Sequence, residues 1–442
     1  MSYELIALLM FLSFMVLLLT GQRVFGAIGI VASAFALSLW GEGAIQMPFA
    51  STITLLNWYP MLTLPMFVYM GYMLSESGIA SDLYRMFHVW FGPMRGGLAV
   101  GTILLMVVIS SMNGLSVAGM AIGATIALPE LLKRGYDKIM TTGVVQAGST
   151  LGIMLPPSVV FVLYAMIARQ PVGQLWLAGV GPGLMLAALF IVYIVVRCHF
   201  QPHLGPPLPA EERARISWGE KLGLLKAGLL PLVIVFSMTG LFVMGATSMV
   251  ESSAVGALAA TLVAWSKGRL SFRIMHEVLR KSLGVSCMFM WIILAALAFG
   301  AVFDGLGAVR AIEVLFLEQW GLEPWQVLVL MQLTYLVMGT FLDDTAMLII
   351  VAPLYIPLII ALGFNPIWYG VLYVITCQIA YITPPFGYNL FLMRAMAPKG
   401  ITLIDIYKSI LPFALIMVVG LGLVIAFPEI ALWLPNQVYG GK

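Results

Sequence analysis

The sequence predicts an all-α, polytopic membrane protein built as an inverted repeat, with two re-entrant helical hairpins and two broken transmembrane helices. The 442-residue chain is 62% hydrophobic and only 9% charged, which is too little charge for the surface of a soluble protein of this length. Two proline pairs, 228 residues apart, interrupt apolar runs long enough to cross a bilayer. Two further apolar runs are too long for one spanning helix and contain polar tips.

The repeat is indicated by landmarks that recur at nearly the same interval as the proline pairs, Pro156-Pro157 and Pro384-Pro385. These landmarks are glycines and prolines, the residues that free or restrict the backbone. The matched pairs are Gly71 and Gly300, Gly78 and Gly307, Pro129 and Pro357, Gly135 and Gly363, and Pro182 and Pro412. Repeats in a membrane chain, each with an interrupted helix, are typical of transporters that bind their substrate between the repeats.

The landmarks divide the chain into two repeats of similar length, joined by a polar segment. That segment is rich in proline and charge, which is typical of a solvent-exposed linker. The predicted divisions are repeat 1 at 1–197, a cytoplasmic linker at 198–227, repeat 2 at 228–428 and a short C-terminal tail at 429–442.

Each repeat is expected to contain a hairpin followed by a broken helix. In repeat 1, three helices precede a hairpin at about 97–131, a broken helix at 138–170 and a sixth helix. In repeat 2, a basic, amphipathic interfacial helix at 272–283 precedes a hairpin at 326–361 and a broken helix at 366–397. Each hairpin arm has about 14 residues, or about 21 Å of helix, which is shorter than the roughly 30 Å hydrocarbon core.

The distribution of basic residues predicts the orientation of the chain. With both hairpins re-entrant and the N-terminus outside, 18 of the 22 Lys and Arg fall in cytoplasmic segments, as the positive-inside rule requires. Counting either hairpin as a full crossing would invert every later segment and remove this bias. The first hairpin therefore opens toward the cytoplasm and the second toward the exterior, so the repeat is inverted.

The broken helices carry groups that can bind both a cation and an anion. Proline has no N–H and disrupts the preceding turn, so upstream carbonyls lose their helical partners. Inside a membrane these carbonyls must be satisfied by protein, and a bound cation is a suitable partner. The half-helix after each break presents N–H groups and a positive dipole end to an anion. A single such break is usually a simple kink, but matched breaks beside matched hairpins favour a sodium and carboxylate site.

Two adjacent carboxylates, Asp343 and Asp344, lie at the tip of the second predicted hairpin. An acid at membrane depth is by default a functional hypothesis. Asp343 has two interpretations, as a cation ligand or as an N-cap of the returning helix, and Asp344 is expected to be the cap. At the equivalent tip of the first hairpin, Asn113 and Ser116 offer neutral oxygens only.

Three charged residues near helix ends have roles that the sequence leaves open. Arg169 and Arg394 follow the two breaks by similar distances. Either arginine could attract an anionic substrate, although arginine near a helix end more often extends toward the membrane interface. Glu251, at the start of a helix, is either a proton site or a carboxylate favoured by the helix dipole.

Several motifs in both halves together form a recognisable pattern. In the first half they are Asn113-Gly114-Leu115-Ser116 through Pro129-Glu130, Gly135-Tyr136-Asp137-Lys138, Gly148 to Ser158, and Leu177-Ala178-Gly179 with Gly181-Pro182-Gly183. In the second half they are Gly339 to Asp343, Thr345-Ala346, Pro353, Pro357, and Thr383-Pro384-Pro385 through Leu390-Phe391. In these motifs the chain resembles, over essentially its whole length, the large membrane subunit of tripartite ATP-independent periplasmic (TRAP) transporters, the DctM-type permease.

The resemblance implies a sodium-coupled, elevator-type importer of small organic acids in a bacterial or archaeal cytoplasmic (inner) membrane. It also implies two partners: a separate four-helix small subunit of the DctQ type, and a periplasmic substrate-binding protein of the DctP type. No cofactor is implied, and Na⁺ is the expected coupling ion. Much of the substrate selection is expected to reside in the binding protein, so this sequence does not name the acid.

The residues and the resemblance together give two overlapping sets of site candidates. The candidate sodium ligands are Asn113, Gly114, Ser116, Gly152, Gly339, Asp343, Thr345 and Thr383. The candidates for substrate binding are Ser116, Pro156, Pro157, Ser158, Pro384, Pro385, Gly387 and Asn389. The chain departs from the family pattern twice: the first tip has Asn113 and Leu115 where a Ser-Gly-Ser-Ser run is usual, and Asp344 stands where proline is usual.

Two other functions are compatible with parts of the sequence. One is a stand-alone sodium- or proton-coupled carrier of dicarboxylates or citrate, with the same architecture but no binding protein. The other is an intramembrane hydrolase, which is disfavoured because the sequence has no His-Glu-x-x-His motif and no plausible nucleophile–base pair at membrane depth. The chain also has no phosphate-binding loop, so ATP hydrolysis by this subunit has no support.

Overall fold

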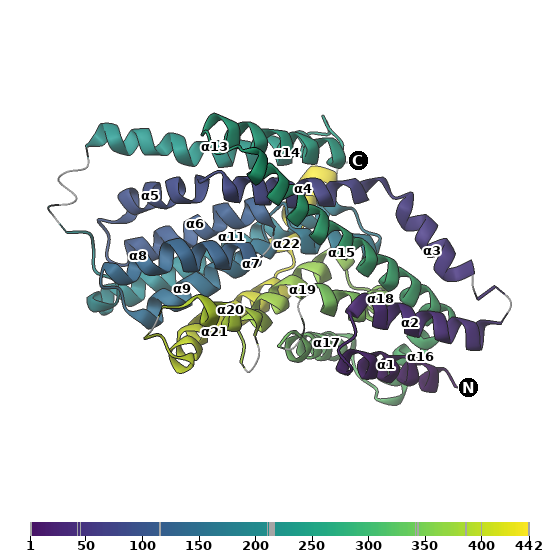
Figure 1. The fold of residues 1–442 in the computed structure, drawn as a ribbon. Coiled ribbons are helices and arrows are strands. Elements are labelled where there is room, and N and C mark those ends of the chain that lie inside the picture. Colours follow the sequence, from purple (N-terminus) through teal and green to yellow (C-terminus); the bar gives the residue numbers. More distant parts are fainter. Residues whose placement is uncertain are drawn as a thin grey trace.

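The computed structural model describes most of the chain, and all of its regular elements are helical (Figure 1). The described residues are 2–41, 43–44, 46–114, 116–209, 211, 217–340, 342, 344–384, 387–398 and 400–440. No β-strand occurs among these residues, so the prediction of an all-α protein is confirmed.

The first half of the chain contains short helices alternating with longer ones. Glycine turns or proline-containing breaks separate most of them. The α-helices are α1 (Tyr3–Leu19), α2 (Val24–Phe35), α3 (Gln46–Leu56), α4 (Thr63–Glu76), α5 (Ile79–Phe91), α6 (Gly97–Asn113), α7 (Ser116–Ile122), α8 (Leu128–Lys133), α9 (Lys138–Thr150), α10 (Val159–Ala168) and α11 (Val172–Phe200).

The second half follows a similar order of elements. It begins with two long helices and ends with a short helix after the last long one. The α-helices are α13 (Trp218–Val243), α14 (Met249–Ser266), α15 (Phe272–Gly305), α16 (Ala308–Glu313), α17 (Pro324–Gly339), α18 (Asp344–Ala361), α19 (Pro366–Tyr381), α20 (Tyr388–Met396), α21 (Leu403–Ala426) and α22 (Glu429–Tyr439).

Five helices of the described chain, α11, α13, α14, α15 and α21, are long and apolar enough to cross a membrane. Their outer faces carry large apolar side chains, such as Phe236 on α13 and Leu411 on α21, which are 71% and 63% exposed. A contiguous apolar surface of this kind is stable in lipid and unfavourable in water. The length, composition and surface of these helices therefore describe a multi-pass membrane protein.

The two helices that precede the proline breaks begin with matching N-terminal caps. Asp137 Oδ1 accepts hydrogen bonds from the amides of Ile139 and Met140 at 3.0 and 2.9 Å, which starts α9. Asn365 Oδ1 accepts from the amides of Ile367 and Trp368 at 2.8 and 3.2 Å, which starts α19. Each cap satisfies amides that have no partner within the helix. A glycine in the left-handed conformation stands two residues before each cap: Gly135 with φ of +76° and Gly363 with φ of +79°.

Helices of the first half pack against helices of the second half in matched pairs. The first match is α1–α16 with α5–α13, and the second is α2–α15 with α4–α14. The third is α7–α20 with α10–α18, and the fourth is α9–α21 with α11–α19. Figure 1 shows one such match, with α1 beside α16 at one end of the molecule and α5 beside α13 toward the other. If each half is numbered in chain order, so that α1, α2, α4, α5, α7, α9, α10 and α11 correspond to α13, α14, α15, α16, α18, α19, α20 and α21, exchanging the halves converts the first pair of each match into the second.

Three boundaries differ from the sequence predictions. The linker is shorter than 198–227, because α11 continues to Phe200 and α13 begins at Trp218. The predicted interfacial helix is not a separate element, because α15 runs unbroken for 34 residues from Phe272 to Gly305. The tail is largely helical, since α22 occupies Glu429–Tyr439 and packs against α11.

The linker lies against the turns that precede the first hairpin and the first broken helix. The Gly96 amide donates to the Gly205 carbonyl at 2.8 Å, and the Leu208 amide donates to the Gly92 carbonyl at 2.9 Å. The Asp137 amide donates to the Leu204 carbonyl at 3.1 Å. The polar segment between the halves is therefore attached to the base of α6 and α9.

A glycine at the contact between α9 and α21 gives a test of the packing. A Cβ added at Gly143 would lie 2.4 Å from the Ser409 carbonyl and 2.8 Å from the Phe413 ring. Gly143→Leu is expected to destabilise the protein by about 1–3 kcal/mol through overpacking, which should lower the melting temperature of the detergent-solubilised chain. Gly422→Leu on α21 is the control, because a Cβ there meets open space. Equal melting temperatures for the two variants would contradict this packing.

Candidate functional site

The first proline break is closed by one serine at the start of α10. Ser158 Oγ donates to the Ile153 carbonyl at 2.5 Å and accepts from the Phe161 amide at 3.2 Å. One hydroxyl thus satisfies a carbonyl upstream of the break and an amide downstream of it. Gly152, Pro156 and Pro157 are buried around this turn, and the Pro156–Pro157 peptide bond is cis.

The second break is closed mainly by backbone bonds. Thr383 Oγ1 donates to the Ile379 carbonyl at 2.6 Å, and the Gly387 amide donates to the Thr383 carbonyl at 3.2 Å. A Cβ at Gly387 would approach the Tyr381 and Thr383 carbonyls to 2.6 and 2.8 Å. Only glycine allows this close approach of carbonyl oxygens to the start of α20.

The tip of the first hairpin lies directly on the first break. The Gly114 carbonyl accepts from the Val159 amide, the first amide of α10, at 3.4 Å. Gly114 has φ of +64°, and a Cβ there would lie 2.3 Å from the Pro157 carbonyl. Both the left-handed conformation and the missing side chain are therefore required for this contact.

A buried asparagine joins this tip to both broken helices. Asn389, at the start of α20, donates from Nδ2 to Ser116 Oγ at 3.2 Å and to Ser149 Oγ at 3.1 Å. Ser116 Oγ also lies 3.4 Å from Asn389 Oδ1. Asn389 and Ser149 are fully buried and Ser116 nearly so. We name these three residues the Asn389 clamp: it connects α7, the end of α9 and the start of α20.

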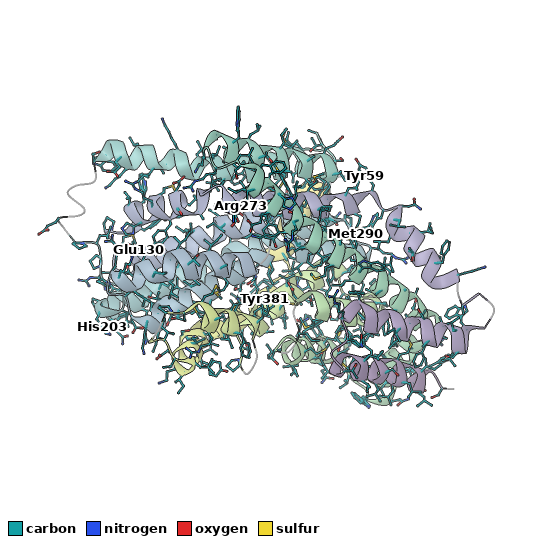
Figure 2. All side chains as sticks on the ribbon, in the orientation of Figure 1. Tyr59, Glu130, His203, Arg273, Met290 and Tyr381 are labelled. Atoms are coloured by element: carbon teal, nitrogen blue, oxygen red, sulfur yellow. The ribbon has the colours of Figure 1, made fainter. Side chains whose placement is uncertain are left out.

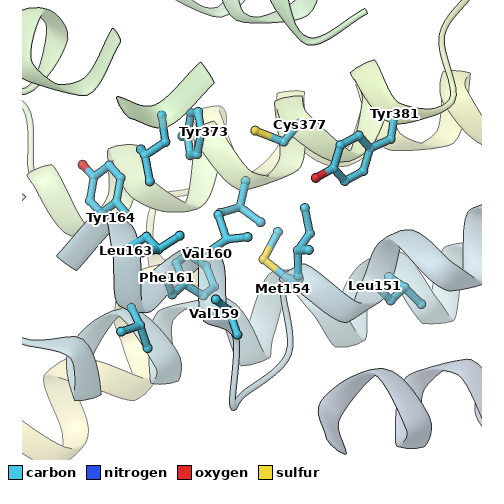
Figure 3. Close-up of a cluster of buried hydrophobic side chains, with 14 of the residues drawn as sticks. Leu151, Met154, Val159, Val160, Phe161, Leu163, Tyr164, Tyr373, Cys377 and Tyr381 are labelled. Carbon is cyan, nitrogen blue, oxygen red and sulfur yellow. The ribbon is translucent and has the colours of Figure 1, made fainter. Parts of the chain in front are cut away.

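The second hairpin meets α19 in a corresponding way. A Cβ at Gly339, the last residue of α17, would lie 2.6 Å from Ala380 Cβ. At the first residue of α18, the Asp344 carbonyl accepts from the Tyr373 hydroxyl at 2.5 Å. Asp344 is itself buried. The α18 helix also packs on α10. Beside it, Tyr164 of α10 stacks with Tyr373 of α19, with ring centroids 6.2 Å apart (Figure 3).

The two broken helices are bonded to each other where both are interrupted. Gln378 Nε2 donates to the Thr150 carbonyl, at the end of α9, over 3.0 Å. The two residues are 228 positions apart, which is also the spacing of the proline pairs. Gln378 is fully buried, and its Oε1 has no hydrogen-bond partner among the described residues.

The structure thus brings together residues from all four predicted components. Ser116, Gly114, Pro157 and Asn389 converge at one junction, with Gly339, Thr383 and Gly387 at the neighbouring one. Asp343 and Pro385 lie outside the described residues, as do the side chains of Asn113 and Thr345. Two participants were absent from the predicted set, Ser149 and Gln378. The repeat interval could have predicted Gln378: adding 228 to the number of Thr150 gives this position, where a side-chain amide stands within an apolar run.

The three charged residues with open roles lie apart from this junction. Glu251 forms a capping box with Ser248: its carboxylate accepts from the Ser248 amide at 2.6 Å and its amide donates to Ser248 Oγ at 3.2 Å. The Arg394 guanidinium donates to the Ile401 carbonyl at 2.8 Å. Arg169 ends α10 in the left-handed conformation and is exposed.

The described part of the junction is rich in neutral oxygens, includes the buried Asp344 and lies near the middle of the molecule. Figure 2 shows Tyr381, the last residue of α19, near the middle, with Glu130 and His203 toward one end. The described residues contain no cluster of three or more His, Cys, Asp or Glu that could hold a metal ion. Serine and threonine hydroxyls, amide oxygens and backbone carbonyls are ligands that suit hard cations. The chemistry available at the junction is therefore binding, and none of the described groups there is a nucleophile paired with a base.

The family of the chain is decided by its sequence match. The model of the family "Tripartite ATP-independent periplasmic transporter, DctM component" matches residues 11–430. The chain belongs to this family. It is 32% identical over 385 residues to the C4-dicarboxylate TRAP transporter large permease protein DctM of Pseudomonas aeruginosa, covering 86% of each chain. It is therefore a large permease subunit of a TRAP transporter, and the prediction of a transporter rather than an enzyme is confirmed.

Two further comparisons extend this result. The isethionate TRAP transporter permease protein DctMQ of Oleidesulfovibrio alaskensis is 24% identical over 415 residues, which cover 92% of this chain and 63% of that protein. The solved YdaH transporter of Alcanivorax borkumensis matches with a TM-score of 0.66 at 13% identity, covering 89% of this chain and 91% of the other. At this low identity, the structural likeness is evidence for the fold of this TRAP permease subunit and for nothing else.

The Asn389 clamp generates a prediction about local stability. Asn389→Ala removes the shared donor and leaves the buried Ser116 and Ser149 hydroxyls without it, at a cost of about 1–3 kcal/mol. Amide hydrogen exchange in the α7 segment 116–122 is expected to accelerate in this variant. Asn436→Ala on the exposed side of α22 is the control. Unchanged exchange in α7 would show that the clamp does not hold the tip.

Proposed function

We propose that this TRAP permease subunit imports small organic acids together with Na⁺, and that the unit carrying the junction moves against the remaining helices as an elevator. The observation that carries the proposal is the convergence of hairpin tips and broken helices from opposite halves of the chain. Such junctions combine unwound backbone carbonyls, which suit sodium, with helix N-termini, which suit a carboxylate. One site can then couple the two ligands.

The matched packing pairs support an inverted repeat. If the halves are related by a pseudo-twofold axis, each contact between halves must occur twice with the partners exchanged. The pairs α7 with α20 and α10 with α18 have this relation. The Asp137 and Asn365 caps begin the corresponding helices α9 and α19 in the same way. The bond from Gln378 to the Thr150 carbonyl joins positions separated by the repeat interval, as expected for residues beside such an axis.

The ion is assigned to oxygens at the tips and breaks. Near the first tip, the Ser116 and Ser149 hydroxyl oxygens both accept from Asn389 Nδ2, and the Gly114 carbonyl lies at the first break. Near the second tip, Gly387 admits two carbonyl oxygens. We assign Asp343 to the ion from its position in the sequence and its negative charge. A charged ligand favours Na⁺ strongly in a buried site because Coulomb interactions are less screened there.

The anionic group of the substrate is assigned to the starts of α10 and α20. Helix N-termini carry a partial positive charge and free amides. Both helices begin at the junction, within the region closed by the two tips. The relatives named above transport a C4-dicarboxylate and isethionate, which share an anionic group but differ in size. We therefore assign the shared carboxylate or sulfonate to the helix ends and leave size selection to surrounding side chains.

Two partner proteins follow from family membership: a periplasmic binding protein and a small membrane subunit. The DctMQ relative extends well beyond the region that matches this chain, and its name combines both permease components. We propose that the small subunit of the present transporter is a separate chain that docks on the exposed apolar helices of this one.

Uptake measurements test the proposed function directly. Membrane vesicles containing both permease chains should accumulate a labelled dicarboxylate only when an inward Na⁺ gradient and the binding protein are both present. Uptake that needs neither would favour a stand-alone carrier, and a proton gradient in place of Na⁺ would overturn the choice of coupling ion.

The assignment of Asp343 has its own test. Asp343→Asn keeps the size of the side chain but removes its charge, so apparent Na⁺ affinity is expected to fall about tenfold to a hundredfold, as for loss of a charge-assisted contact. The measurement is the initial uptake rate against Na⁺ concentration. Glu318→Gln, an exposed acid outside the junction, is the control. A lower melting temperature with unchanged Na⁺ dependence would identify Asp343 as a helix cap.

The proposed orientation predicts which residues can be labelled from outside intact cells. In a background without Cys198, Cys287 and Cys377, a cysteine replacing Glu4 should react with a membrane-impermeant maleimide. A cysteine replacing Glu211 in the linker should react only after the cells are permeabilised. Labelling of the linker in intact cells would contradict the N-terminus-outside orientation and the inverted arrangement of the hairpins.

A further inference from the structure

A cavity lies outside the junction, between α15 and α18. It is a cavity of about 700 Å³ whose walls come from α3, the end of α10, α15 and α18. None of the junction residues discussed above contributes to its lining. Its volume falls within the range of small-molecule sites in proteins. We call it the α15/α18 cavity.

The inner wall of the α15/α18 cavity is apolar and made of small residues. Ala296, Gly300 and Ala301 line it from α15, and Ala352 and Ile356 line it from α18. Ala296 and Ala352 are fully buried. Such a wall offers no hydrogen bonds, so it would leave the polar groups of a small carboxylate unsatisfied. A hydrocarbon chain, by contrast, has no polar groups that this wall would leave unsatisfied, so it can occupy the wall without that cost.

The outer wall carries two opposite charges. Arg169 comes from the end of α10 and Asp304 from α15, and both side chains are exposed. No ion pair within 4 Å joins them or binds either to another described residue. The α15/α18 cavity therefore changes from a buried hydrocarbon-like interior to an outer edge with one guanidinium and one carboxylate.

We propose that the α15/α18 cavity binds a zwitterionic phospholipid, with an acyl chain against α15 and α18 and the headgroup between Arg169 and Asp304. The guanidinium matches the lipid phosphate, for which arginine provides several donors in a fixed geometry. The carboxylate matches the ammonium group of phosphatidylethanolamine. The surrounding apolar surface of the helices gives access from the bilayer, since Ile360 on the same wall is 54% exposed.

Photo-crosslinking tests the position of the acyl chain. The probe is phosphatidylethanolamine with a diazirine near the end of one acyl chain, mixed into vesicles that contain the full chain. After illumination and proteolysis, mass spectrometry should find adducts on segments 296–304 and 352–361. Gly300→Leu fills the cavity and should remove these adducts. Gly284→Leu, on the same helix where a Cβ meets open space, should retain them.

Charge variants test the position of the headgroup. Arg169→Asn removes the guanidinium and still suits the left-handed conformation, which asparagine tolerates. It is expected to reduce adduct yield about fivefold, the effect of one basic residue on an anionic lipid group. Arg310→Asn is the exposed control. Asp304→Asn should reduce labelling by the phosphatidylethanolamine probe and increase labelling by a phosphatidylglycerol probe with the same acyl chain.

Three results would overturn the proposal. Equal labelling in Gly300→Leu and Gly284→Leu would place the acyl chain elsewhere. An unchanged adduct yield in Arg169→Asn would show that the headgroup does not lie at Arg169. A large loss of adducts on adding millimolar succinate would identify the α15/α18 cavity as a route for the organic acid rather than a lipid site.

Discussion

Backbone groups that have left a helix inside a membrane must find partners without water, and the centre of this protein is organised by that requirement. Both proline breaks release carbonyls and amides. Ser158 Oγ bridges the first break, whereas backbone bonds together with Thr383 Oγ1 close the second. Gln378, which is 228 residues away in the sequence, then donates a hydrogen bond to the Thr150 carbonyl. The hairpins are positioned as a result, because their tips lie against these same interruptions.

The groups that meet at the junction are mostly neutral, and this affects what they can do. Neutral oxygens bind a cation weakly enough to release it, whereas an isolated buried charge would be too costly to leave empty. The Asn389 clamp places such oxygens on elements from both halves. A ligand that contacts one of these elements therefore changes the surroundings of the others, which is the physical basis for coupling two ligands in one site.

The parts that sequence predicts well are those with a local chemical signature. Proline pairs, polar tips and capping residues interrupt apolar runs, so the hairpin ends and both breaks follow from the residues themselves. The Asn389 clamp could not be predicted in this way, because Ser116 and Asn389 are 273 residues apart and only the folded structure shows that their side chains meet. The length of α15 also differs from the prediction of a separate interfacial helix. A basic, amphipathic segment is compatible both with such a helix and with the polar end of one long helix.

The clamp has a consequence for an empty transporter. Moving α7 away from α20 separates Asn389 from the buried Ser116 hydroxyl and breaks the hydrogen bond between them. At about 1–3 kcal/mol for such a loss, the opened tip is populated roughly five- to a hundredfold less than it would be without this bond. In the proposed sodium-coupled mechanism, spontaneous leakage of ions through a site that holds no cargo would be suppressed by the same factor. A single interior amide would then help to preserve the ion gradient.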